Sequence, residues 1–548
     1  MKILLSIWFL IINIGVIVSQ STNQLKLSGG LQVGISANSS NVSAPIYSPF
    51  GYQMSGQIVG RIFGFSVPLS IYYSDNTRKF SQPFTRVGMS PKYKKVKIHL
   101  GHRNIRFGEY SLAGNTMFGV GVEFNPSNFR LGIAHGKLNS AVKNVEGIEN
   151  IIGSQYDRIG TAYKIGFGNK KNSIDLSFLS ARDEIESSIR DSLSEFYEPA
   201  QENAVIEIRS SLSLSENINM EIGGAASAFN DDIRSQEISK DYTGKGILNK
   251  FFIPRINSDF RKAIYCRLTA SHNNYGFSLE YKRIDPDFKS MGAYRFYTDL
   301  QNLTINPNFS INNKVRFNGT LGIQSNNLTN RRLRKTNRFI GRGNLSFQWL
   351  DKASSSISYS NFRSNIISTQ DEILSDSFNI IQISEQLNLN TTIQLGGSER
   401  RRSVNVSTFL SEFSTVTDLQ VFENSGNKQY GISCMYSQFN TDSKSSWNVG
   451  LNYNNTSSRG IETKRISMRT GMITSFTQSI RINASILIGN TSFTDEISQF
   501  FSSLSTGVVY QVAKTQTLNF RSTFYLRKRT DTQLINNLIF NLNYGTSF

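Results

Sequence analysis

The stretch LINNLIFNLNYGTSF, from Leu534 to the final residue, decides the fold class. Large apolar side chains recur at every second position from Phe540 to Tyr544, and Asn541 and Asn543 stand between them. Successive side chains of a β-strand point to opposite faces of the sheet. The stretch therefore predicts a strand with one oily face and one polar face.

The same alternation recurs along most of the chain beyond Gln20. Strands of this kind, bounded by turn-forming residues, can be marked one after another, and their number comes to about 26. The expected strands lie near residues 25–36, 55–62, 64–74, 84–90, 94–102, 115–125, 128–138, 157–168, 172–184, 203–215, 218–230, 263–271, 275–284, 296–309, 313–326, 337–350, 354–363, 381–396, 401–414, 427–440, 445–456, 461–474, 478–490, 498–512, 515–527 and 533–548.

The connections between these strands distinguish a barrel from a soluble sandwich. Every second connection is short, such as Pro126–Ser127 or Ala513–Lys514, whereas the others are mostly longer and extend up to Asp231–Lys262. Short and long loops alternate in this way in transmembrane β-barrels, whose strands must close on themselves because lipid offers no hydrogen bonds. We therefore predict an all-β, antiparallel, up-and-down transmembrane barrel with both termini on the periplasmic side.

The N-terminus has the features of a secretory signal peptide. Met1-Lys2 precedes an apolar run from Ile3 to Val18, and a plausible cleavage site lies before Gln20. An uncleaved anchor is the alternative interpretation, but the run is short for a membrane span. We expect a signal peptide at residues 1–19, one barrel domain at residues 20–548, and export to the bacterial outer membrane.

Composition and special residues limit the other classes. With 59 Lys+Arg against 40 Asp+Glu the chain is basic, but nucleic acid is not an expected partner for an outer-membrane protein. Cys266 and Cys434 are the only cysteines, and we expect two free thiols rather than a disulfide or a metal site. Trp349 and Trp447 fall on the apolar parity at the periplasmic ends of their strands, where interfacial aromatic residues gather.

Three stretches carry a family resemblance. They are FGFSVPLSIYYSD (Phe63–Asp75), FTRVGMSPKYKKVKIHLGHR (Phe84–Arg103) and GNTMFGVGVEFNPSNFRLGIAHG (Gly114–Gly136). This region resembles large, porin-like outer-membrane barrels of Bacteroidetes-type bacteria, a family without a settled biochemical role. The resemblance implies a location more than an activity.

Better-understood large barrels are not expected. A TonB-dependent receptor needs a plug domain before its first strand, and an Omp85-type barrel needs periplasmic domains there. Only Gln20 to Gln24 precede the first expected strand. The lipopolysaccharide-inserting barrel is similar in strand number, but it carries an N-terminal jelly roll and more cysteines.

Little in the sequence indicates catalysis. The four histidines are His99, His102, His135 and His272, and a histidine beside a serine and an acid could form a hydrolase site. No Gly-x-Ser-x-Gly elbow accompanies them. We therefore expect no enzyme and assign no catalytic, cofactor-binding or metal-binding residue.

Basic clusters indicate anionic surroundings. Arg331, Arg332, Arg334, Lys335 and Arg338 crowd one expected outer loop, and a second group comprises Lys245, Lys250, Arg255, Arg261 and Lys262. Arg400 to Arg402 form a basic turn on the periplasmic side. Such clusters attract lipopolysaccharide phosphates and anionic headgroups. Outer-membrane lipid and lipopolysaccharide are the expected partners, either through generic docking or at a specific site.

The expected lumen is wide and polar. A barrel of 16 to 18 strands already leaves an aqueous channel, so a larger one needs a plug, a flattened shape or a partner. The internal candidate for the plug is the 231–262 loop, where Phe251, Phe252, Ile253 and Pro254 form an apolar knot. We expect a gated or plugged transport channel for polar or anionic solutes or a macromolecule. The alternative is a non-transporting scaffold that anchors a partner in an export or assembly complex.

Overall fold

The structure is a computed structural model. It describes residues 25–41, 49–74, 86–141, 156–169, 171–187, 199–238, 252–293, 297–312, 314–332, 334–368, 380–397, 399–417, 426–458, 460–493, 497–530 and 534–548. The expected signal peptide lies outside these residues.

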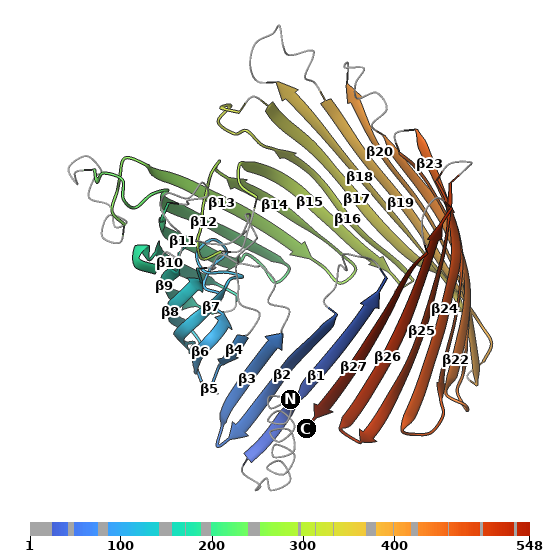
Figure 1. Ribbon diagram of the computed structural model, residues 1–548. Helices are drawn as coiled ribbons and strands as arrows, with labels where there is room; N and C mark the ends of the chain where they lie inside the picture. Colours follow the sequence, from blue (N-terminus) through green and yellow to red (C-terminus); the bar gives the residue numbers. More distant parts are fainter. Residues whose placement is uncertain are drawn as a thin grey trace.

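Strands make up nearly all of the described chain (Figure 1). They are β1 (Leu25–Ser40), β2 (Phe50–Ile62), β3 (Phe65–Ser74), β4 (Arg86–Met89), β5 (Lys92–Tyr93), β6 (Val96–Asn104), β7 (Thr116–Phe124), β8 (Phe129–Asn139), β9 (Arg158–Gly168), β10 (Ser173–Asp183), β11 (Glu202–Ser213), β12 (Ile218–Asn230), β13 (Ser258–Ser271), β14 (Tyr275–Ile284), β15 (Leu300–Ile311), β16 (Val315–Ser325), β17 (Arg334–Leu350), β18 (Ala353–Ser368), β19 (Ile380–Leu395), β20 (Arg400–Thr417), β21 (Asn427–Asn440), β22 (Ser445–Ser458), β23 (Ile461–Ser475), β24 (Ile480–Ser492), β25 (Ser498–Ala513), β26 (Gln516–Arg529) and β27 (Ile535–Ser547). One short 3-10 helix, η1, spans Ile185–Ser187. No helix in the described ranges is long and apolar enough to cross a membrane.

The strands occupy 26 positions in one antiparallel sheet. β4 and β5 share a single position, because each of them pairs with β3 on one side and with β6 on the other. Ser90 and Pro91 interrupt the strand expected at 84–90, and proline cannot donate the hydrogen bond that a continuous ladder needs. Every other strand expected from the alternation is present, with shifted ends.

The sheet closes on itself between its first and last strands. β1 pairs with β27 from Gly30 opposite Ser547 to Ser40 opposite Asn537. The amide of Phe548 and the carbonyl of Gly29 then continue the ladder at 3.0 Å. Closure removes both sheet edges, which is the condition for placing strands in lipid.

The two ends of the barrel differ in their connections. Two to four residues join the strands at the end where β1 begins and β27 finishes, as at Phe63–Gly64, Asp351–Lys352 and Lys514–Thr515. The connections at the opposite end are mostly longer, and the start of β1 lies beside the end of β27 at the short-turn end (Figure 1). This arrangement confirms the expected up-and-down topology. We call the short-turn end periplasmic and the other end outer.

The two faces of the wall follow the alternation. On β7, Phe118, Val120 and Val122 point outward and stay exposed, whereas Gly119 and Gly121 between them face the lumen. Trp349 and Trp447 also point outward, beside periplasmic turns, as expected. Exposed apolar side chains around a closed wall form the surface that lipid covers in a transmembrane barrel.

Candidate functional site

The lumen of the N-terminal half is filled by two connections that fold inward. Residues 105–115, between β6 and β7, and residues 285–293, between β14 and β15, pack against the inward face of the wall. Together with inward side chains of β7–β14 they form the largest buried apolar cluster. It comprises Ile105, Phe107, Tyr110, Leu112, Met117, Ala134, Leu138, Ala162, Leu179, Ala181, Val205, Ala225, Phe229, Ala263, Tyr265, Ile284, Phe288 and Met291.

One buried carboxylate holds the first inward connection. Glu207 on β11 is 2% exposed, and it accepts hydrogen bonds from the backbone amides of Glu109 at 2.7 Å and of Tyr110 and Ser111 at 2.9 Å each. Lys282 on β14 adds an ion pair to Glu109 at 2.6 Å. Gly108 is required here, because a Cβ at this position would collide with the Glu207 carboxylate.

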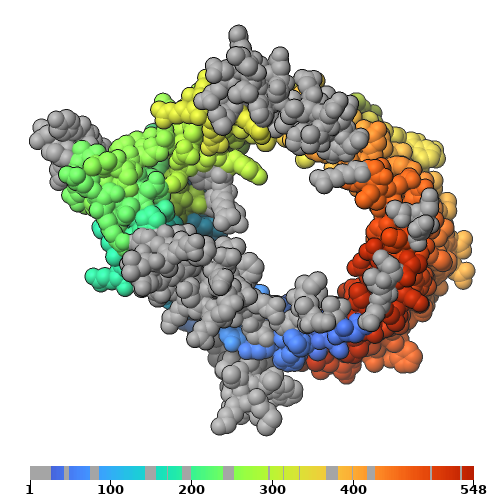
Figure 2. Space-filling model, turned by 45° about the horizontal axis from the view of Figure 1, so that its top comes forward, coloured from blue at the N-terminus to red at the C-terminus, as the bar shows by residue number. Residues whose placement is uncertain are grey.

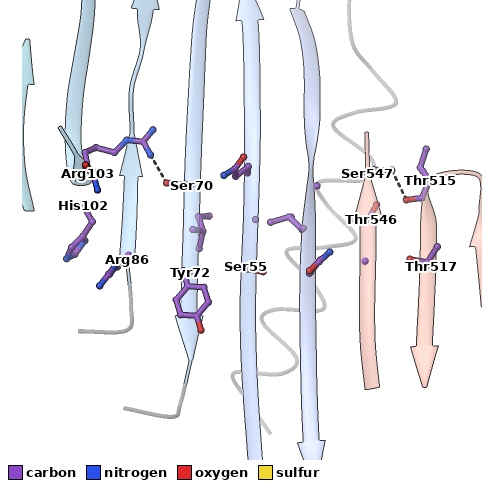
Figure 3. A pocket seen from close by; sticks show the side chains of 18 of the residues that line it. Ser55, Ser70, Tyr72, Arg86, His102, Arg103, Thr515, Thr517, Thr546 and Ser547 are labelled. Atoms are coloured by element: carbon purple, nitrogen blue, oxygen red, sulfur yellow. Dashed lines mark hydrogen bonds between the residues drawn. The ribbon is translucent and has the colours of Figure 1, made fainter. Parts of the chain in front are cut away.

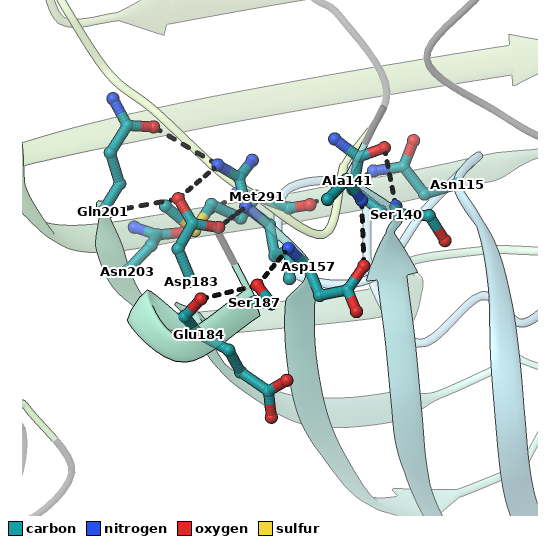
Figure 4. Close-up of polar contacts among 12 residues, drawn as sticks. Asn115, Ser140, Ala141, Asp157, Asp183, Glu184, Ser187, Gln201, Asn203 and Met291 are labelled. Atoms are coloured by element: carbon teal, nitrogen blue, oxygen red, sulfur yellow. Dashed lines mark hydrogen bonds and ion pairs between the residues drawn. The ribbon is translucent and has the colours of Figure 1, made fainter. Parts of the chain in front are cut away.

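The second connection is fixed by a buried amide. The Asn203 side-chain oxygen accepts from the Met291 amide at 3.0 Å (Figure 4). The Asn203 side-chain nitrogen donates to the Ala228 carbonyl at 3.0 Å. Ser227 donates to the Lys289 carbonyl at 2.6 Å. The two connections also bind each other, since the Ala113 amide donates to the Gly292 carbonyl.

Ion pairs close the outer end of this half (Figure 4). Arg158 binds both carboxylate oxygens of Asp183, at 2.7 and 3.0 Å. Asp157 accepts from Lys137 at 2.6 Å and from the Ala141 amide at 2.9 Å. Burial opposes ionisation of the Asp157 carboxyl, but these hydrogen bonds outweigh it and lower its pKa below the ordinary value.

Charges on this side of the lumen are neutralised in pairs. The inward face of β6–β14 carries both signs, and most of its cations contact carboxylates of neighbouring strands, whereas Arg103 donates to Ser70 and the Pro68 carbonyl. The pairs are Lys97–Glu123, Arg130–Asp175, Lys164–Asp175, Arg209–Glu221 and Arg267–Glu280. We call this half, β6–β14 with the two inward connections, the paired wall.

On the opposite side of the lumen, the charged inward side chains of the described strands are all arginines. In the described strands β15–β27, no inward position holds Asp, Glu or Lys. We call this half the arginine wall. Its inward cations are Arg316, Arg334, Arg338, Arg342, Arg401, Arg465, Arg469, Arg481, Arg521, Arg527 and Arg529. The other inward residues are mostly Asn, Ser, Thr, Gln and Gly.

Aromatic rings, rather than carboxylates, support some of these arginines. The Arg465 guanidinium lies 4.1 Å from the ring centre of Phe501, and Phe501 pairs directly with Arg527 on β26. The ring lies flat over Gly489, where a Cβ would collide with it. Together they border a lumenal pocket of about 570 Å³ between β22 and β26, lined also by Gln499. A cation beside an aromatic face suits an organic anion.

A second lumenal pocket lies where the chain closes the barrel (Figure 3). It has a volume of about 730 Å³ and spans β26 and β27 through β1 to β7. Arg103 donates to Ser70 at 2.7 Å within it, and Arg86 also lines it. Its lining contains serine, threonine, glutamine and two arginines but no carboxylate.

Between the two walls the barrel is hollow. Figure 2 shows an opening through the centre of the ring, bordered by the blue first strands, the red last strands and the green to yellow strands between them. The inward connections occupy the side of the paired wall alone. The described residues thus leave a lumen whose free side is basic.

The histidines lie apart. His99 contacts Ser90 through Nδ1 at 3.0 Å and Glu123 through Nε2 at 2.6 Å. In a serine hydrolase the serine contacts Nε2 and the acid contacts Nδ1, which is the reverse of this arrangement. Ser90 and His99 are also buried in the wall, where a substrate cannot reach them. His102 contacts the exposed Phe118 ring, His135 the Thr161 hydroxyl, and His272 the Tyr275 ring. The described residues contain no cluster suited to a metal ion.

The apolar knot of the 231–262 loop does not enter the lumen. Phe252 is buried against Ala204, Ala228 and Phe178, which occupy outward positions of β11, β12 and β10. The expectation that this knot plugs the lumen is therefore wrong for its described part, and Phe251 lies outside the described residues. Phe252 is buried, but on the outward face of the wall, because the small side chains of Ala204 and Ala228 leave space for its ring there.

The basic clusters have mixed surroundings. Lys245 and Lys250 lie outside the described residues, whereas Arg255 pairs with Glu237 and Arg261 with Asp259. In the other cluster, Arg332 pairs with Asp299, Arg338 faces the lumen and Lys335 faces outward. Arg400–Arg402 lie at the short-turn end, as expected, but they begin β20 instead of forming the turn itself.

Both cysteines are free thiols at outward positions, Cys266 on β13 and Cys434 on β21.

Sequence reasoning missed the inward connections, although a signal was present. Inward positions of the paired wall are unusually small, at Gly121, Gly132, Gly160, Ala162 and Ala225. A Cβ on Gly121 would press on Ile105, and one on Gly132 would press on Phe107. A run of small inward residues beside an apolar loop therefore indicates where that loop packs.

Comparisons with known proteins give distant structural likenesses. No family model and no curated protein matches the chain. Pseudomonas aeruginosa OccK1 (OpdK) is 9% identical with a TM-score of 0.31, covering 64% of this chain and 93% of its own. The P pilus usher (PapC) translocation pore is 9% identical with a TM-score of 0.39, covering 95% and 99%. The Escherichia coli P pilus tip assembly intermediate PapC-PapD-PapK-PapG is 11% identical with a TM-score of 0.44, covering 89% of this chain and 61% of its own. Likenesses this distant carry no functional argument, and the barrel assignment rests on the strand register.

Proposed function

We propose that this protein is a channel of the bacterial outer membrane that passes polar solutes and prefers anions. It reaches that membrane through its signal peptide, belongs among the Bacteroidetes-type barrels that it resembles, and has no enzymatic role. The solute path runs along the arginine wall, and the inward connections narrow the lumen from the other side.

The segregation of charge carries this proposal. Most cations on the paired wall contact carboxylates, so they contribute little net field, whereas the arginine wall has no inward carboxylate in its described strands. A water-filled lumen lined by one sign of charge concentrates counter-ions. Keeping many arginines on a wall that has no inward carboxylate in its described strands costs folding free energy through charge repulsion, so an anionic guest is the natural reason for them.

The row Arg465–Phe501–Arg527 provides a binding site for anions along this path. Its two guanidinium groups offer planar pairs of donors to a carboxylate or phosphate, and the Phe501 ring offers an apolar face. Organic anions with a flat apolar part would therefore be held more strongly than chloride.

The test is the reversal potential of single channels of the refolded barrel in a planar bilayer with a KCl gradient. The variant R465Q/R527Q removes two lumenal charges, and R402Q/K528Q removes two outward charges from strands of the same half. Each arginine within about 8 Å of a passing ion contributes roughly 0.2 kcal/mol at ~0.1 M salt. We expect the chloride to potassium permeability ratio to fall about two- to fourfold in the first variant and to stay unchanged in the second. Equal ratios in all three proteins would refute the proposal.

A scaffold that anchors a partner protein is the second candidate, and the open lumen favours it, because an unoccupied pore of this size would weaken the membrane barrier. Folded barrels that give no conductance, together with a protein that co-purifies from native membranes, would favour the scaffold.

A further inference from the structure

A groove on the outward face has the features of a lipid site. It lies near the outer ends of β14–β18 and has a volume of about 480 Å³. Its floor is formed by Leu303, Ile323 and Phe339, and its polar side by Asn337, Arg363 and Asn365. We call it the outer groove. It lies on the other side of the wall from the lumen, so it has no part in the proposed solute path.

The strand register places an apolar row directly below a polar row. Leu303 pairs with Ile323, Ile323 with Phe339, and Phe339 with Arg363, so three exposed apolar side chains end at one guanidinium. One step toward the outer end, Ser325 pairs with Asn337 and Asn337 with Asn365. The outer groove therefore straddles the upper edge of the apolar band, where headgroups begin.

Below the groove the wall offers an apolar surface. Gly341 and Gly343 occupy the next two outward positions of β17 after Phe339, and the rings of Phe339 and Phe317 lie against them. Leu321 on β16 pairs with Gly341, whereas the β18 side is polar, because Asn361 and Tyr359 there bind Glu385. An apolar surface that leads down from a polar rim matches an acyl chain attached to a headgroup.

The charge of the groove selects an anionic headgroup. Arg363 is exposed, and among the described residues no carboxylate lies within ion-pair distance of it. Lys335, at the next outward position above Asn337, adds a second cation. A guanidinium binds phosphate with two parallel hydrogen bonds, and the asparagine amides beside it suit sugar hydroxyls.

We propose that the outer groove binds the phosphorylated, acylated glycolipid of the outer leaflet, with a phosphate on Arg363, sugar hydroxyls on Asn337 and Asn365, and one acyl chain on the apolar surface of Phe339, Leu321 and Phe317 below them. A glycolipid fits better than a phospholipid because the polar row carries amides as well as cations. The site requires an outer-membrane location but does not depend on conduction through the lumen.

The test is native mass spectrometry of the refolded barrel mixed with diphosphorylated lipid A, with lipid A lacking phosphate, or with phosphatidylglycerol. We expect retained diphosphorylated lipid A to fall about tenfold in R363Q, as a bidentate charge-assisted pair is lost. The matched control R402Q removes an outward arginine at the periplasmic end and should keep wild-type binding. N365D is a second variant that places a carboxylate beside Arg363, and it should also weaken binding.

Three results would overturn this proposal. They are equal binding in R363Q and R402Q, equal binding of lipid A with and without phosphate, and equal binding of phosphatidylglycerol, which would indicate a general site for acidic lipids. Heat-modified migration in gels verifies that each variant is folded. Channel selectivity should be unchanged in R363Q, so failure of this proposal and failure of the channel proposal are distinguishable.

Discussion

Glu207→Gln should release the inward connection at residues 105–115. In the wild type, the Glu207 carboxylate accepts three backbone amides and lies almost fully buried. Glutamine keeps one acceptor oxygen and the shape, but it loses the charge and brings an NH₂ group toward the amides that the second oxygen had bound.

The magnitude follows from these bonds. A hydrogen bond to a charged group contributes about 1.5–3 kcal/mol, and of the three bonds the substitution abolishes about one and weakens the other two. We expect local docking of the connection to lose roughly 2–4 kcal/mol. This corresponds to about 30- to 700-fold faster hydrogen exchange, since about 1.4 kcal/mol is one factor of ten. The cluster around Phe107 and Phe288 remains, so the barrel itself should stay folded.

The assay is hydrogen exchange at the Tyr110 and Ser111 amides, read beside channel recordings of the same protein. The control is Glu280→Gln, which removes an inward carboxylate that contacts Arg267 but not the connection. If exchange at Tyr110 is unchanged in E207Q, or changes equally in E280Q, the carboxylate does not hold the connection. Larger or noisier single-channel currents in E207Q alone would identify residues 105–115 as a constriction.

Two further predictions concern the outer end and the arginine wall. The pKa of Asp157 is lowered in the folded state, so its contribution to stability is present at neutral pH and is lost as the pH falls through that lowered value. Protection of the Ala141 amide should therefore collapse in acid, whereas D157N, which cannot titrate, should show weaker protection that does not change with pH. Phe501→Leu should remove the aromatic ring while keeping an apolar side chain at that position; the guanidinium of Arg465 then loses its cation–π contact, and the permeability ratio for organic anions over chloride should fall about two- to threefold without loss of folding. An unchanged ratio in F501L would show that the ring takes no part in selectivity.

The barrel itself was predictable because its signal is local. Alternation at Phe540 to Tyr544 and at Phe118 to Val122 requires only the period of a strand, and lipid on one side keeps that alternation strict. The single break, at Ser90 and Pro91, comes from a proline that does not disturb the alternation and so does not show in it. Strand ends moved by several residues, since outer strands continue above the membrane, where polar residues form strands equally well.

The site was less predictable because it depends on register. That arginine belongs to the inward parity can be read from single strands. The meeting of Arg465 and Arg527 at one ring follows only from the pairing of neighbouring strands, and so does the confinement of inward carboxylates in the described strands to β6–β14. The position of Phe252 was unpredictable for the same reason. Its sequence indicates burial, but the face of the wall on which it is buried depends on where Ala204 and Ala228 lie.

The two walls of this wide barrel have different roles: the paired wall supports a packed core, and the arginine wall borders the open lumen. Small inward residues on β7–β13 let the connections at 105–115 and 285–293 pack as a core, and paired charges let that core be dry. Large, hydrated arginines on β16–β26 prevent such packing, because their burial without carboxylates would be costly. The lumen therefore fills from one side and stays wet on the other. Removing the inward connections should accordingly widen the pore without changing its preference for anions, whereas removing the arginines should change the preference without changing the width.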